Sequence, residues 1–177
     1  MIQLSNKIKG SLEMFQKRLE IFFITTIAIA LLYLINNIYK TQSFKNNDIP
    51  DSYKERIYEK EQEVLTLMQK NFGQSLKIPL IVTDKFKGRL YGLTSYNSGK
   101  IKIYLNKKVM QESMDYMIDS VIAHEYAHAL LFAQGEYQTK SEGHSKRWRE
   151  TCIKLGGKDC RQYVNTHEII MSKMPFK

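Results

Sequence analysis

Two histidines spaced four residues apart constrain this chain of 177 residues more than any other feature. They are His124 and His128, in the segment His124-Glu125-Tyr126-Ala127-His128. Residues four apart lie on one face of an α-helix, so both imidazoles can reach one metal ion from the same side. Glu125 then lies beside the metal without being a ligand. The fold must bring a third ligand to this face of the helix.

The helix that carries this segment is predicted to be buried. Ser113 is a suitable N-cap and Gly135, after Gln134, is a stop signal. Apolar residues recur between them at helical spacing: Met114, Met117, Ile118, Val121, Ile122, Ala129 and Leu130. Unpaired histidines and a glutamate are costly on an interior helix, whereas a bound metal gives all three a physical role. The alternative is an ordinary helix that carries the same string on an exposed face.

His144 is the predicted third ligand, although a lone histidine near a turn is often only a solvated cap. A second helix is predicted from this point to a stop at Gly156-Gly157, and its inward face holds His144, Trp148, Cys152 and Leu155. We interpret Trp148 and Cys152 as core residues. The remaining histidine, His167, has no motif around it and is interpreted as structural or exposed.

Three histidine ligands and a neighbouring glutamate predict catalytic chemistry. A zinc ion with three protein ligands keeps a fourth position for water and lowers the pKa of that water from about 15.7 toward about 7. Glu125 would accept the proton of the zinc-bound water and return it to the leaving amine. A purely structural zinc site closes its fourth position with another Cys or His and does not need the glutamate. The set therefore predicts metal-assisted peptide hydrolysis, a zinc metallopeptidase reaction of the endopeptidase type.

Residues 124–157 resemble the SprT-like zinc metalloproteases, the group that includes the Spartan DNA-protein crosslink proteases. The resemblance rests on His124 to His128, Glu142-Gly143-His144, Trp148 and Leu155-Gly156. Gly92 to Tyr96 and Lys100 to Asn106 are similar to the strand region that precedes the metal helix of that family. One departure is Ser145, where the family often has glycine.

The resemblance implies a fold and assigns roles to residues. It implies an α+β, zincin-like metallopeptidase domain in which a small antiparallel sheet packs on the metal-binding helix. His124, His128 and His144 would be the Zn²⁺ ligands and Glu125 the catalytic residue. An edge strand of such a sheet commonly holds an extended peptide substrate, and we assign this role to Lys100 to Leu105.

The segment from Ile21 to Ile35 contains no charge and is apolar nearly all the way round a helix. With Asn36 to Tyr39 it has about 19 residues, which approaches the length needed to cross the roughly 30 Å hydrocarbon layer. It predicts a single-pass membrane anchor at residues 21–39. The alternatives are a buried core helix and a cleaved signal peptide, but no small-x-small cleavage site follows the run.

The side of the membrane that the catalytic domain faces is only weakly indicated. Counting lysine and arginine around the anchor favours an inside N-terminus and an outer catalytic domain. The SprT-like enzymes are associated with intracellular work, which favours the opposite orientation. Cys152 and Cys160 are compatible with either orientation. They can form a disulfide if the domain faces an oxidising space, or remain free thiols if it does not.

The predicted organisation is a tail and anchor at residues 1–40, a polar linker at 41–51 and one catalytic domain at 52–177. An amphipathic helix is expected from Ser52 to Asn71, stopped by Gly73. Its inward residues are Ile57, Val64, Leu65, Met68 and Phe72. Strands are expected at Ile78 to Thr83, Arg89 to Tyr96 and Lys100 to Leu105, with a hairpin at Asn97-Ser98-Gly99.

The net charge of +9 raises the question of the partners. Basic residues near His144 and around the strands include Lys146, Arg147, Arg149, Lys85, Lys87, Arg89, Lys100, Lys102, Lys107 and Lys108. They can track phosphates, face anionic lipid, favour acidic substrates or simply keep the protein soluble. The predicted partners are a protein or peptide substrate and the membrane. Two alternatives remain: a DNA-associated protease acting on DNA-bound proteins, and a non-catalytic zinc-binding membrane scaffold.

Overall fold

The computed structural model describes residues 2–86, 90–136 and 144–161, with the backbone alone for residues 2–12. The chain divides into two compact units, residues 1–47 and 48–177, which are described separately. Glu142, Gly143 and His167 lie outside the described residues, as do Lys87 and Arg89.

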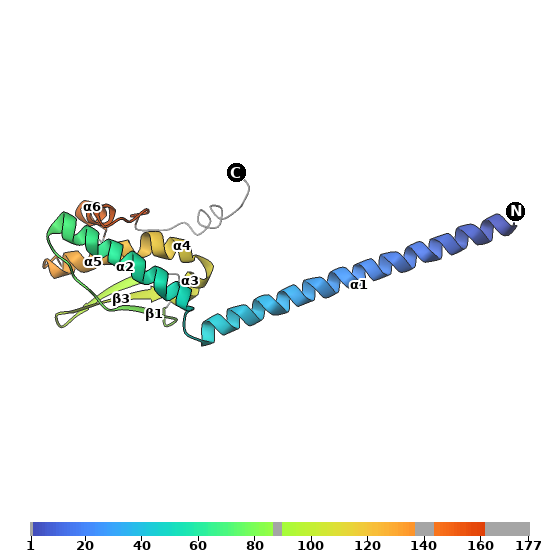
Figure 1. The fold of residues 1–177 in the computed structure, drawn as a ribbon, viewed down its shortest axis with the longest axis horizontal. Helices are drawn as coiled ribbons and strands as arrows, with labels where there is room; N and C mark the ends of the chain where they lie inside the picture. Colours follow the sequence, from blue (N-terminus) through green and yellow to red (C-terminus); the bar gives the residue numbers. More distant parts are fainter. Residues whose placement is uncertain (1, 87–89, 137–143, 162–177) are drawn as a thin grey trace. The chain divides into compact units, whose positions relative to one another are not determined.

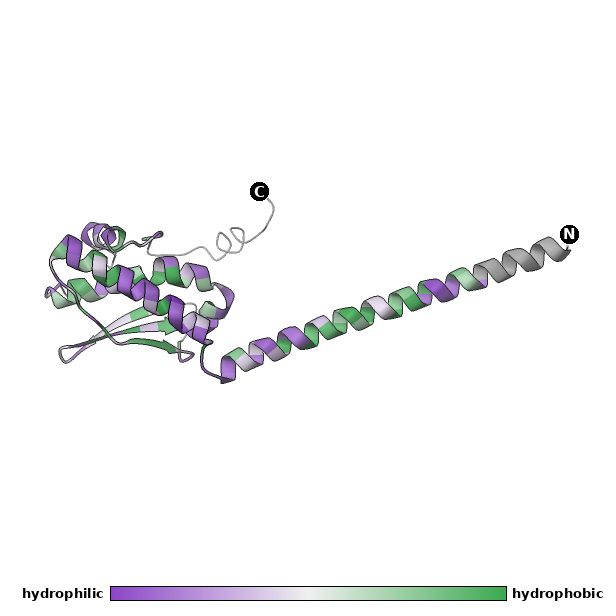
Figure 2. Cartoon of the chain, viewed as in Figure 1, coloured by the Kyte–Doolittle hydropathy of each residue, from purple (hydrophilic) through white to green (hydrophobic). Residues whose placement is uncertain are grey.

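The first unit is one helix, α1 (Ile2–Asn46). Its segment Glu13–Asn46 is long and apolar enough to cross a membrane, by length and composition. Figure 2 shows mainly hydrophobic residues along the middle of the helix. The hydroxyls of Thr25 and Thr26 donate to the carbonyls of Ile21 and Phe22, 2.8 Å away in both cases, which satisfies them within the helix.

The second unit contains a three-stranded sheet with helices against it (Figure 1). Helix α2 (Asp51–Phe72) closely follows the predicted bounds. The strands are β1 (Leu80–Thr83), β2 (Gly92–Asn97) and β3 (Lys100–Asn106). The hairpin turn between β2 and β3 has positive φ at Ser98 and Gly99, the conformation of a type I′ turn. Helix α3 (Lys107–Glu112), which the sequence pattern did not reveal, follows β3.

Two predictions about the sheet are wrong. The strand order is β1-β3-β2, and β1 pairs with β3 in parallel, so the sheet is mixed rather than antiparallel. Strand β3 is also the central strand, so Lys100 to Leu105 is not an edge. The hairpin makes β2 and β3 neighbours, but it does not determine on which side β1 pairs. The burial of Ile103 and Leu105 agrees with a central position.

The metal helix is part of a longer helical run that is not uniform. It begins with α4 (Met114–Tyr116), continues as the π-helical turn η1 (Met117–Val121) and ends as α5 (Ile122–Ala133). Ser113 occupies the N-cap position, but its side chain makes no capping hydrogen bond. Such π-turns are often found at functional sites because the extra residue turns the following side chains. Here that turn directly precedes the segment that carries both histidines.

The core lies between α2, α5, α6 (Lys146–Lys154) and the inner face of the sheet. Ile57, Val64 and Met68 of α2 are buried, while Leu65 and Phe72 are partly buried against the same cluster. Trp148, Cys152 and Leu155 are buried as predicted. The two cysteines form a disulfide between Cys152 and Cys160. Helix α6 is thereby tied to the segment that follows it.

Candidate metal centre

The three predicted ligands come together from two parts of the chain. His124 and His128 lie one turn apart on α5, and His144 immediately precedes Ser145, the N-cap of α6. The Nε2 atom of His144 lies 3.1 Å from Nε2 of His124 and 3.3 Å from Nε2 of His128. The hydroxyl of Ser145, the residue that departs from the family pattern, accepts a hydrogen bond from the backbone N–H of Trp148 at 3.2 Å. Ser145 therefore caps the N-terminus of α6. This cap fixes the start of the helix directly after His144.

The cluster has the dimensions of a zinc site. Zinc is bound by histidine nitrogen at about 2.0–2.1 Å, so two tetrahedral ligands are separated by roughly 3.3–3.4 Å. The measured separations of 3.1 and 3.3 Å are close to this value. Three ring nitrogens this close, facing one another, are poorly satisfied without a shared cation. These residues therefore fit a tetrahedral metal ion that keeps one position for another ligand.

The environment also keeps the imidazoles neutral, as metal ligands must be. Burial lowers the pKa of His124 to about 3, and the neighbouring His144 contributes in the same direction. Burial likewise lowers the pKa of His128 to about 3. The pKa of His144 is lowered by burial as well. At neutral pH all three side chains can offer lone pairs.

Trp148 forms one wall of the cluster. Its ring centroid lies 4.5, 5.1 and 4.4 Å from those of His124, His128 and His144. The indole is stacked on His128 and meets the other two edge to face. The sequence pattern alone indicates only that Trp148 is a core residue. The structure shows that this part of the core also restricts the orientation of every candidate ligand.

Glu125 is buried, with 5% of its surface exposed, and faces the edge strand β2. The hydroxyl of Thr94 lies 2.7 Å from Oε2 of Glu125 and 2.9 Å from its carbonyl oxygen. Burial raises the pKa of Glu125 to about 7, while the hydrogen bonds of Thr94 oppose that rise. A carboxylate with this pKa can both accept and release a proton near neutral pH.

Sequence reasoning did not assign a role to Gly92 or Thr94. A Cβ atom added at Gly92 would lie 2.6 Å from Oε1 and 2.8 Å from Cγ of Glu125. A glycine inside a strand pattern often marks the close approach of another group, and that signal was present in the sequence. The identity of the approaching group could come only from the fold.

We expect Gly92→Ala to destabilise the domain by about 1–3 kcal/mol, because the new methyl group overlaps the buried Glu125 side chain. Urea unfolding of both proteins measures the difference. The same substitution in a Glu125→Ala background is the matched control, since the overlap is then absent. An equal loss in both backgrounds would show that the contact with Glu125 is not the cause.

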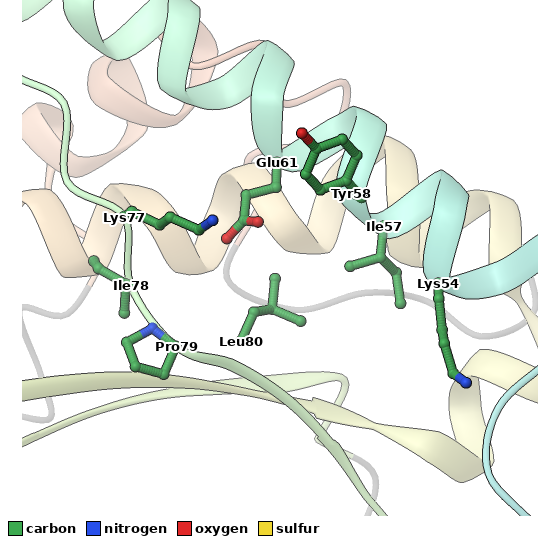
Figure 3. A pocket seen from close by; sticks show the side chains of 8 residues that line it. All are labelled: Lys54, Ile57, Tyr58, Glu61, Lys77, Ile78, Pro79 and Leu80. Atoms are coloured by element: carbon green, nitrogen blue, oxygen red, sulfur yellow. The ribbon is translucent and has the colours of Figure 1, made fainter. Parts of the chain in front are cut away.

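A pocket of about 420 Å³ lies between α2 and the start of β1, and no member of the histidine cluster lines it (Figure 3). Its buried carboxylate, Glu61, accepts a 2.6 Å hydrogen bond from the hydroxyl of Tyr126. Burial and the Glu61 carboxylate raise the pKa of Tyr126, so its hydroxyl remains a donor. This bond ties α2 to the metal helix. The pocket itself has no part in the candidate chemistry.

Comparison with known proteins agrees with this geometry. The model of the SprT-like family matches residues 60–168, a segment that contains His124, Glu125, His128 and His144. The family is generally associated with zinc and with metalloprotease-like function. A comparison with curated proteins finds no match. Because the family model covers more than half of the chain, the protein belongs to the SprT-like family.

Proposed function

We propose that this protein is a membrane-anchored zinc metallopeptidase that hydrolyses peptide bonds. The observation that carries the proposal is the convergence of three neutral histidine nitrogens beside a buried glutamate. A structural zinc site would use the fourth position for a further side chain. Among the described residues, no other His, Cys, Asp or Glu joins the cluster.

The proposal assigns a role to each residue of the site. His124, His128 and His144 would hold Zn²⁺, which when bound lowers the pKa of a water molecule and polarises a carbonyl. Glu125 would take the proton from the attacking water and deliver it to the leaving amine. Thr94 and Gly92 border the Glu125 carboxylate on the side of β2. Trp148 covers the three imidazoles from the side of α6.

The extended substrate would lie along β2 rather than β3. Strand β2 is an edge of the sheet, and its residue Thr94 contacts Glu125, whereas β3 pairs on both sides. An edge strand has free backbone groups that can pair with a peptide. The substrate would still pair with an edge strand, but that strand is β2 and not Lys100 to Leu105 of β3.

The test is cleavage of an unstructured, fluorescently labelled protein by the full chain in detergent. We expect cleavage that requires zinc, stops on chelation and returns when zinc is restored. A folded, zinc-loaded protein that cleaves none of a panel of unstructured substrates would favour the non-catalytic zinc-binding scaffold instead.

The DNA-associated alternative draws no specific support from the basic residues Lys146 and Arg147 next to His144. Of the basic residues near His144, Arg147 pairs with Glu136 and donates to Gln134, while Lys146 lies 4.0 Å from Glu150. These side chains have partners within the protein. Adding duplex or single-stranded DNA to the cleavage assay tests the DNA-associated alternative, which requires the rate to rise.

The proposed anchor is the apolar part of α1, residues 21–39, and we propose that the catalytic domain faces the outer side of the membrane. The charge count around the anchor favours this orientation. The Cys152–Cys160 disulfide supports it further, because such bonds persist mainly in oxidising compartments. Protease added to right-side-out vesicles should degrade the domain. Protection there, with degradation in inverted vesicles, would reverse the orientation.

Removing residues 1–47 should release a soluble domain, since residues 48–177 form a separate compact unit. The only candidate span in the described residues lies in the removed part. The measurement is the distribution between supernatant and membrane after alkaline extraction, with the full chain as control. Retention of the truncated protein in the membrane would contradict the anchor. The mass of the full chain after expression separates an uncleaved anchor from a signal peptide.

A further inference from the structure

Two residues of β2 together surround the carboxylate of Glu125. Gly92 and Thr94 are two residues apart and therefore face the same side of the strand, toward α5. Thr94 contacts Oε2, and the space where a side chain at position 92 would lie is occupied by Oε1 and Cγ. Oε2 thus accepts a hydrogen bond from Thr94, whereas Oε1 packs against the backbone of Gly92, which has no side chain.

This arrangement restricts Glu125 more than burial alone would. A glutamate side chain has three rotatable bonds, and an α-helix leaves several of its rotamers accessible. The hydroxyl of Thr94 can donate its single proton to Oε2 or to the carbonyl oxygen of Glu125. Both acceptors belong to the same residue, so either choice holds this part of α5 against β2. The carboxylate bond is the shorter of the two.

We propose that Thr94 is a positioning residue for Glu125, holding its carboxylate in one orientation for the water that is activated. The inference rests on the proposed peptidase function. Proton transfer requires the base to lie within about 2.6–3.2 Å of the proton that it removes. A carboxylate that rotates among several positions meets this condition only part of the time. The hydroxyl of Thr94 therefore acts on the rate of the chemical step through the Glu125 carboxylate that it holds.

The test compares Thr94→Val, which keeps the shape and removes the hydroxyl, with Thr94→Ser, which keeps the hydroxyl. We expect Thr94→Val to lower kcat by about 10–100-fold, as is typical when a supporting hydrogen bond of an active site is removed. KM should change by less than about twofold and the zinc content should not change. Thr94→Ser should restore most of kcat, which a purely structural loss of packing would not do.

Thr83→Val is the matched control. Thr83 lies on β1, the opposite edge of the same sheet, and its hydroxyl accepts a 3.3 Å hydrogen bond from the N–H of Lys85. The Thr83→Val variant loses a threonine hydroxyl from an edge strand, as Thr94→Val does. It should retain the wild-type kcat. An unchanged kcat in Thr94→Val would overturn the inference. The inference would also be overturned if Thr94→Val lost zinc together with activity and Thr94→Ser were equally inactive.

A second measurement separates this inference from the proposed function. Crystal structures of the wild-type protein and Thr94→Val show whether the Glu125 carboxylate moves when the hydroxyl is removed. If the wild-type protein hydrolyses no peptide but the carboxylate changes position in the variant, the positioning role stands and the peptidase proposal fails. If the carboxylate stays in place, the positioning role fails whatever the activity.

Discussion

Replacing Glu125 with glutamine should abolish most hydrolysis while the protein still folds and binds zinc. The substitution keeps the size of the side chain and removes its ability to accept a proton. General base catalysis contributes about 10²–10⁴-fold to a rate, so kcat should fall by this factor. Folding should be preserved, because an uncharged amide is less costly than a carboxylate at a site where burial raises the pKa of Glu125 to about 7.

The measurement is kcat and KM on an unstructured substrate, together with zinc content. The wild-type enzyme should also lose activity on acidification, as Glu125 takes up a proton and can no longer act as a base. A bound zinc ion lowers the pKa of this neighbouring carboxylate, so the midpoint should lie below 7. Wild-type kcat in Glu125→Gln would exclude Glu125 as the base.

Replacing His144 with alanine should weaken zinc binding and remove activity with it. The other two ligands share one helix, whereas His144 comes from the turn before α6 and closes the site from another direction. Loss of a residue that only supports a ligand typically costs 10–100-fold in metal affinity. Removal of a ligand itself should exceed about 100-fold. Competition with a chelator of known zinc affinity measures this factor.

His167→Ala is the matched control for His144→Ala. His167 belongs to neither motif, and its removal should leave zinc binding unchanged. A variant lacking His144 that binds zinc as tightly as the wild-type protein would remove this residue from the ligand set. If the wild-type protein is folded and supplied with metal but binds no zinc, the prediction of a zinc site is wrong.

The histidine pair of the candidate site could be predicted from sequence because its spacing is encoded locally. The spacing of His124 and His128 follows from the helical repeat, and the glutamate between them is part of the same short string. The inward face with Trp148, Cys152 and Leu155 also follows from helical spacing, and all three are buried. The bounds of α2 were close because amphipathic spacing and a terminal glycine act within a few residues.

The errors concern pairing between distant segments. Alternation along β3 predicts a strand but not its neighbours, so it cannot distinguish a central strand from an edge strand. The parallel pairing of β1 with β3 depends on where the chain returns after α2, which no local pattern records. The π-helical turn η1 is not visible in the sequence because its apolar spacing is close to that of an α-helix.

The sequence by itself determined which side chains can bind a metal, which of them can move a proton, and which segment is apolar enough to enter a membrane. These properties depend on residue type and on periodicity over one or two helical turns. Only the tertiary structure decided that His144 meets the other histidines, that β2 is the edge strand beside Glu125, that Gly92 and Thr94 enclose its carboxylate, and that the two cysteines pair. Each of these contacts forms between segments that are separated along the chain or joined by a turn. They stabilise the protein only when the whole core has packed, because ordering each segment alone costs conformational entropy.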